Sequence, residues 1–194
     1  MDLPLRNRLR EKMPEILIEA CSVAFAVVLA LWVNDWSSER QLDHQATALK
    51  SAVISELRSN LADLDDSRPK LQQGIGDAQR FLGPDGHQVH VLNFTVRLSL
   101  LSAAAWQTTQ FSAASQRLDA DWRVKTAQVY ELQALYQRQQ EATMDALNAF
   151  AILGEGERPA SSSVRALDTQ MRTMMTLNQQ LAERYRALLR ETRQ

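Results

Sequence analysis

The most suggestive residue for chemistry is Glu19, an acidic side chain inside an apolar stretch. The 18 residues from Ile16 to Val33 are apolar except for Glu19 and Ser22. A helix needs about 17–25 such residues to cross a bilayer. Ionisable groups inside a membrane span are costly and often mark ion paths or partner contacts. Three interpretations are open: a boundary or helix-pairing residue, a contact with a partner subunit, and a proton-coupling group.

Aromatic and charged side chains in two later segments form the second set of candidates. Trp106, followed by Thr108 and Ser112, could line a polar pocket, and Arg123 with Tyr130 could form a surface for a ligand or partner. The alternative is structural for both groups. In the first group, Trp106 would be a buried ring, and the Thr108 and Ser112 hydroxyls would bond to their own helix. In the second group, Tyr130 would be a core residue surrounded by solvated charged side chains.

Metal-binding and catalytic patterns are weak or missing in the sequence. His87 and His90 are spaced H-x-x-H without a Cys or His/Glu set nearby, which is a poor ligand array. The motifs G-x-S-x-G, Walker A, Rossmann glycine run and H-E-x-x-H do not occur. A net charge of −1 gives no basic footprint for nucleic acid. We therefore predict no enzyme, no cofactor, no metal and no nucleic-acid partner.

The element that must position Glu19 is a predicted transmembrane helix at residues 14–36. A basic arm at residues 1–13 precedes it, whereas only Arg40 and Lys50 follow closely. The positive-inside rule then places the N-terminus in the cytoplasm and residues 37–194 in the periplasm of a bacterial cell. No A-x-A cleavage site lies between the end of the apolar run at Val33 and Trp36, so we predict an anchor rather than a cleaved signal.

Two features of this helix suggest contacts with lipid and with a second helix. Small residues recur every four positions, which allows close approach of two membrane helices, although alanine is also simply common in such helices. These are Ser22, Ala26 and Ala30. Indole rings prefer the membrane interface, and charged residues follow them as interface anchors or intersubunit ion pairs. These interface residues are Trp32, Trp36, Glu39 and Arg40.

Apolar spacing of three and four predicts that the rest of the chain is helical. The first helix ends or kinks at Arg68–Pro69, and further helices follow at 70–82, 98–111, 117–150 and 164–189. The stretch 87–96 is ambiguous. The loop 154–163 supplies an N-cap. The predicted apolar stripes include Leu61, Leu132 and Leu177. The expected fold is all-α, an antiparallel bundle of about four helices continuous with the membrane helix.

Two segments resemble an uncharacterised family of bacterial single-pass inner-membrane proteins. The first is Glu19 with the later ALWVNDWSSER (residues 30–40), similar to the family's A-L-x-x-N-x-W-x-x-E-R. The second is AAAWQTTQFSAAS (103–115) followed by WRVKTAQVYE (122–131), which resembles its R-x-K-x-x-x-[L/V]-Y-E. The resemblance covers roughly residues 19–136. It implies a membrane-anchored helical domain and supplies no activity.

We expect a non-enzymatic inner-membrane protein that acts as a scaffold or accessory subunit of a membrane complex. Its partners would be the lipid bilayer and either a second copy or another membrane subunit. One alternative is a periplasmic bundle that senses a small molecule, and another is a proton-coupled partner using Glu19. A pocket lined by Trp106 or Tyr130 would favour the sensor. An apolar stripe left exposed by the bundle would favour assembly.

Overall fold

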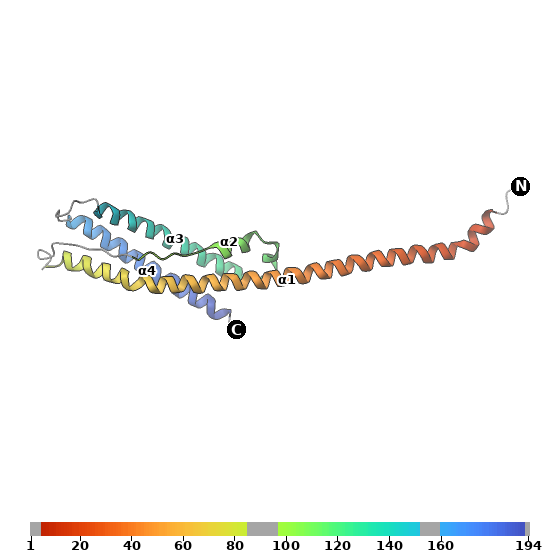
Figure 1. The fold of residues 1–194 in the computed structure, drawn as a ribbon, viewed down its shortest axis with the longest axis horizontal. Coiled ribbons are helices and arrows are strands. Elements are labelled where there is room, and N and C mark those ends of the chain that lie inside the picture. The colour runs from red at the N-terminus through yellow and green to blue at the C-terminus, as the bar shows by residue number, and fades with distance from the viewer. Residues whose placement is uncertain (1–4, 85–96, 152–159, 193–194) are drawn as a thin grey trace. The chain divides into compact units, whose positions relative to one another are not determined.

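The structure, a computed structural model, describes residues 5–84, 97–151 and 160–192, and side chains from residue 21 to 148 and from 160 onward within them (Figure 1). The helices are α1 (Leu5–Leu82), α2 (Ala104–Phe111), the 3₁₀ helix η2 (Ala113–Arg117), α3 (Ala120–Ala151) and α4 (Ser161–Glu191). The chain divides into two compact units, Met1–Ala46 and Thr47–Gln194, and α1 contributes to both. The predicted all-α fold is confirmed: a long apolar N-terminal helix is followed by helices that pack against it.

The first unit contains an apolar segment of α1 that the chain leaves uncovered. Val23 and Phe25 are 60% and 69% exposed, and their neighbours up to Trp36 are exposed as well. One described helix holds an 18-residue window that is long and apolar enough to cross a membrane, and none of that window is buried. By length and composition, the chain therefore carries a candidate membrane span.

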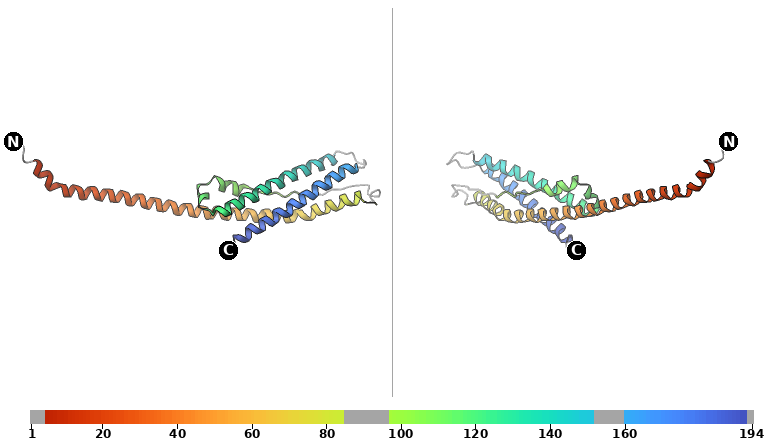
Figure 2. Two further views of the ribbon diagram at one scale, coloured as in Figure 1. Left: turned by 180° about the vertical axis from the view of Figure 1, so that it is seen from behind. Right: turned by 45° about the vertical axis from the view of Figure 1, so that its right-hand side comes forward.

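The second unit is built on α1, α3 and α4. Lys50 of α1 lies 5.4 Å from the Trp122 ring of α3, and Asn60, further along α1, reaches Gln133, further along α3. These two helices therefore run in the same direction. The α4 helix runs the opposite way, since Lys125 near the start of α3 contacts the end of α4. Figures 1 and 2 show α3 and α4 side by side.

The core side chains of all three helices follow alternating spacings of three and four residues, as in left-handed bundles. Their polar members are concentrated on α3. The buried positions in this spacing are Val53, Leu57, Asn60, Leu64, Ser67, Leu71, Gly74, Ala78 and Phe81 on α1, Trp122, Thr126, Val129, Gln133, Tyr136 and Thr143 on α3, and Val164, Leu167, Met171, Met174, Asn178, Leu181, Tyr185 and Leu188 on α4. Tyr130 of α3 and Ala182 of α4 are buried beside them.

Pro69 does not start a new helix. A separate helix from Lys70 is wrong, because α1 continues without interruption to Leu82. A proline inside a helix costs about 3 kcal/mol, but the buried stripe keeps its spacing on both sides of Pro69, which is itself exposed. Packing of that stripe outweighs the local cost. Asn178 of α4 also donates a hydrogen bond to the Leu64 carbonyl at 3.1 Å, in the turn before the proline.

Buried amides occupy positions that the apolar pattern assigns to leucines. Leu61, Leu132 and Leu177 are only half-buried. The adjacent residue takes each core position instead: Asn60, Gln133 and Asn178. A hydrophobicity pattern cannot anticipate this exchange, because a buried amide is tolerated only where its hydrogen-bond partners are present.

Two predicted boundaries are also corrected. The helix predicted over 98–111 begins only at Ala104, and residues 97–103 are not helical. The last helix begins at Ser161 rather than Val164, and Ala160, within the loop predicted to supply the N-cap, is the N-cap and makes no side-chain hydrogen bond there. The ambiguous stretch 87–96, with His87 and His90, lies outside the described residues.

Two glycines of α1 predict opposite effects of substitution. A Cβ at Gly74 would lie 3.1 Å from Met171 Sδ, whereas one at Gly76 would meet nothing within 4 Å. We expect Gly74→Leu to destabilise the fold by roughly 1–3 kcal/mol through overpacking. We expect Gly76→Ala to stabilise it by about 0.5–1 kcal/mol through helix propensity. Thermal unfolding of the full chain in detergent measures both. A Gly74→Leu variant as stable as wild type would contradict this helix contact.

Candidate functional site

The N-terminus of α2 is held by a carboxylate from α1. Glu56 accepts hydrogen bonds from the backbone N–H groups of Ala105 (2.9 Å) and Trp106 (3.4 Å), and from the Ser102 hydroxyl (2.7 Å). The N-cap residue of α2 makes no side-chain hydrogen bond, so Glu56 fills the capping role from a distant helix. The Tyr130 hydroxyl donates a fourth hydrogen bond at 2.6 Å, which ties α3 to the same carboxylate.

Electrostatics keep this carboxylate charged. Burial raises the pKa of Glu56, but the hydrogen bonds from Tyr130, Ala105, Ser102 and Trp106 together lower it more, so its pKa lies below the ordinary 4.5. For Tyr130, burial and then the Glu56 carboxylate raise the hydroxyl pKa far above its ordinary 10.0. Tyr130 therefore remains a donor and Glu56 an acceptor at neutral pH.

An extended segment, residues 97–103, precedes α2 and is hydrogen-bonded by side-chain amides. The Asn60 amide donates to the Ser102 carbonyl at 2.7 Å and accepts from the Ser102 N–H at 2.9 Å. Gln133 of α3 donates to the same carbonyl at 3.0 Å. The Tyr185 hydroxyl of α4 in turn donates to Gln133 at 2.5 Å. One backbone position of the segment is thus connected to all three long helices.

Two further glutamines of α3 continue this arrangement. Gln137 donates to the Leu101 carbonyl at 3.0 Å. Gln140 accepts from the Ser99 N–H at 3.0 Å and donates to the Ser99 carbonyl at 3.3 Å. Ser99 and Leu101 are the buried residues of the segment, and buried backbone groups must find partners. Side-chain amides of α3 supply those partners in place of backbone groups.

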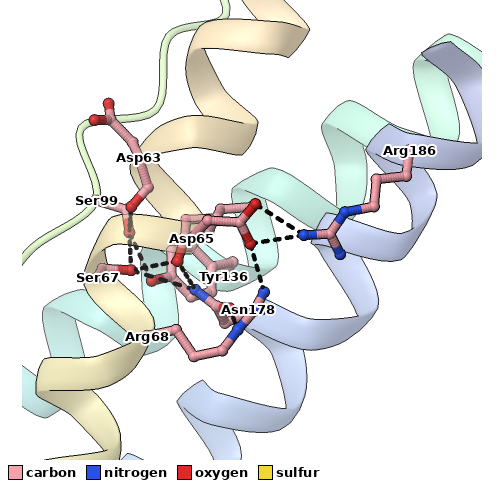
Figure 3. A network of polar contacts seen from close by, with 9 residues as sticks. Asp63, Asp65, Ser67, Arg68, Ser99, Tyr136, Asn178 and Arg186 are labelled. Carbon is pink, nitrogen blue, oxygen red and sulfur yellow. Dashed lines mark hydrogen bonds and ion pairs between the residues drawn. The ribbon is translucent and has the colours of Figure 1, made fainter.

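A hydroxyl and amide cluster fixes the same segment near its start (Figure 3). Ser99 Oγ lies 2.7 Å from Ser67 Oγ of α1 and 3.1 Å from the Tyr136 hydroxyl of α3. Asn178 of α4 donates to Ser67 Oγ at 3.3 Å. On the rim, Asp65 accepts from Arg186 of α4 at 2.7 and 2.8 Å. The cluster sets the register of three helices at one level.

Trp106 is held in an aromatic cluster against α3. Its ring stacks on Tyr130 with centroids 5.7 Å apart and planes within 7°. It meets Trp122 edge-on at 6.5 Å. Both Trp106 and Tyr130 are only 7% exposed. The contacts therefore support the interpretation of these two residues as buried aromatic side chains. Their rings form the wall of a site and do not form an open surface.

An open hollow of about 500 Å³ lies beside this wall, between α2, η2 and the start of α3. Trp106 and Arg123 line it together with Val124. Arg123 is half-buried, and its Nε is shielded from solvent without a hydrogen-bond partner among the described residues. The structure thus brings Trp106 and Arg123 to one site, while Tyr130 supports Trp106 from behind.

The other candidates are placed on α1 or outside the described side chains. Glu19 lies within α1, but its side chain is outside the described residues. In the first unit the Arg40 guanidinium lies 4.0 Å from the Trp36 ring centroid, a cation–π contact. The remaining span and interface candidates are exposed in the chain itself: Ser22, Ala26, Ala30, Trp32 and Glu39.

The sequence interpretation missed the residues that position this site. Glu56 and Asn60 are separated from α2 by more than forty positions, so no local pattern connects them. A signal did exist on α3, where Gln133, Gln137 and Gln140 recur at spacings of four and three. A stripe of amides at that spacing marks one helix face that must satisfy another polar group.

No family model, curated protein or solved structure matches this chain. The resemblance to uncharacterised inner-membrane proteins therefore stays a prediction. Among the described residues, no group of three or more His, Cys, Asp or Glu is placed to hold a metal ion. The features available for a functional interpretation are therefore the uncovered apolar helix, the amide-bonded segment and the hollow.

The Glu56 cap predicts a specific acid sensitivity. Since its pKa is lower in the folded than in the unfolded chain, its contribution is present above pH 4.5 and is lost as the pH falls through the folded pKa. We expect Glu56→Gln to cost about 1–2 kcal/mol at pH 7 and to flatten the decline in stability as the pH falls below 4.5. Urea unfolding across this range measures both effects.

Glu183→Gln is the matched control, because Glu183 is exposed on α4. It should leave the pH profile close to wild type. An identical profile for Glu56→Gln and wild type would contradict the capping role.

Proposed function

We propose that this chain is a non-enzymatic, single-pass membrane protein that serves as a scaffold or accessory subunit of a membrane complex. The first unit is the anchor, and the second unit is a rigid helical domain that it presents outside the bilayer. The expected location is a bacterial inner membrane, with the N-terminus in the cytoplasm and the helical domain in the periplasm.

One observation carries the proposal: the apolar window of α1 has no cover from the chain itself. Helices that are apolar all round and unburied are stable only in lipid or against another protein. Val23 and Phe25, followed by Leu29 and Leu31, lie on several sides of the helix and are exposed in the described part of the chain. Lipid on most of this surface and a second helix on one face supply that cover.

The second unit supports a scaffold because its construction favours rigidity. Its core contains hydrogen-bonded amides and hydroxyls from α1, α3, α4 and the extended segment. Buried polar networks of this kind specify one register when each group is bonded. Phe111, at the end of α2, is 90% exposed and offers an apolar contact point outside the core. A rigid domain with such a point suits docking on a partner.

Self-association is testable along the face that carries Ser22, Ala26 and Ala30. In a Cys21→Ser background, a cysteine at Ala26 should form disulfide-linked dimers when membranes are oxidised, because small residues let two helices approach closely. The matched control is Val28→Cys, which lies about 200° away around the helix. We expect a several-fold higher dimer yield for Ala26→Cys.

Equal yields at the two positions would contradict pairing through this face. Recovery of the full chain in the aqueous fraction without detergent would contradict the membrane anchor itself. Retention of another membrane subunit on mild-detergent purification, without cross-linking, would support the accessory role over self-association.

Orientation has its own test. In the Cys21→Ser background, a cysteine at Ser162, which is exposed at the start of α4, should react with a membrane-impermeant maleimide in intact spheroplasts. A cysteine at Asn7 should react only after lysis, because the positive-inside rule keeps the basic arm in the cytoplasm. The reverse labelling pattern would contradict the periplasmic placement.

A further inference from the structure

Arg123 differs from the other half-buried arginines of the described chain in how it is paired. Three arginine side chains there are half-buried: Arg68, Arg123 and Arg186. Arg68 and Arg186 both contact the Asp65 carboxylate, at 3.1 and 2.7 Å. The Arg123 side chain forms no hydrogen bond or ion pair with any described residue, and its Nε is closed off from solvent. Buried donors without partners are uncommon and call for an explanation.

The surroundings of Arg123 have the composition of a small-molecule site. The hollow of about 500 Å³ combines an indole ring from Trp106, the exposed aliphatic side chain of Val124, and polar groups from Gln110 and Ser115. Ligand sites are concave and mostly apolar, with a few polar groups that fix orientation. The wall is pre-organised, because Trp106 is stacked on Tyr130 and its backbone N–H is bonded to Glu56.

We propose that this hollow binds a small organic oxyanion with an apolar or aromatic body. Arg123 pairs with the anionic oxygens, and Trp106 and Val124 contact the apolar body. A guanidinium presents donors in a planar fork that matches carboxylate and phosphate. The bound oxyanion supplies an acceptor for the Arg123 guanidinium, which has none among the described residues. This site does not depend on the membrane assignment, because all its residues belong to the second unit.

The test is calorimetric titration of the full chain in nanodiscs of uncharged phosphatidylcholine. The probes are 3-phenylpropanoate, phenyl phosphate, the neutral 3-phenylpropanamide, acetate and inorganic phosphate. For about eleven non-hydrogen atoms we expect millimolar or tighter binding of the carboxylate or the phosphate ester. Whichever of these two binds more tightly identifies the oxyanion. The amide, acetate and inorganic phosphate should each bind at least about tenfold more weakly, since each lacks one half of the recognised chemistry.

Arg123→Met keeps an unbranched apolar side chain and removes the guanidinium, so it should weaken binding of the anionic aromatic probe about tenfold or more. Arg123→Lys keeps the charge without the fork and should give an intermediate affinity. The control is Arg138→Met on an exposed position of α3, which should bind as wild type does. Circular dichroism establishes that each variant is folded.

The proposal is overturned if no probe gives saturable binding to wild type, or if Arg123→Met binds as tightly as wild type. Acetate or the neutral amide binding as tightly as 3-phenylpropanoate would also overturn it. If Arg123→Met does not fold, the comparison of propanoate with amide on wild type and the Arg123→Lys affinity decide the matter. A chain that binds the probe yet proves water-soluble would retain this site and lose the membrane proposal.

Discussion

Extended backbone cannot be buried in a helical bundle unless its N–H and C=O groups find partners. In the second unit this requirement is met by side-chain amides that α1 and α3 direct at residues 97–103. Asn60 makes two hydrogen bonds to Ser102, and Gln133 makes a third. Ser99 and Leu101 are the buried residues of this segment, and the Asn60 and Gln133 amides that reach Ser102 are buried as well. An unmade hydrogen bond in a buried position costs about 1–3 kcal/mol, so these bonds hold the segment against the bundle.

The rest of the unit depends on that placement. Because the segment carries the chain back along the bundle, α1 and α3 run in the same direction, which two helices joined by a short loop could not do. Its end delivers the start of α2 to Glu56, which caps it from a distance of 49 residues along the chain. The capped α2 in turn holds Trp106 against Tyr130 and closes one side of the hollow at Arg123.

The general architecture follows from the sequence, because apolar spacing reports which face of a helix is buried. The uncovered N-terminal span, the long helices and the buried aromatic residues are all present in that pattern. That pattern does not contain the exchange of Leu61 for Asn60 or of Leu177 for Asn178, because a buried amide depends on partners from other elements. For the same reason the sequence does not reveal Glu56, whose partners lie more than forty positions away. Pro69 likewise predicts a helix break, but packing against distant elements keeps α1 continuous. Trp106 and Arg123 could be singled out by type, but their shared hollow arises only when α2 and α3 meet.

The most direct test of this construction is amide hydrogen exchange of Ser99 and Ser102 in the full chain, resolved by NMR or mass spectrometry. If amide side chains hold the segment, both N–H groups should exchange as slowly as the helical amides in the middle of α3, although neither lies in a helix. Asn60→Ala should remove the protection of Ser102. Exchange of both wild-type amides at the rate of an unprotected loop would contradict the central claim that these side chains hold the backbone of the segment.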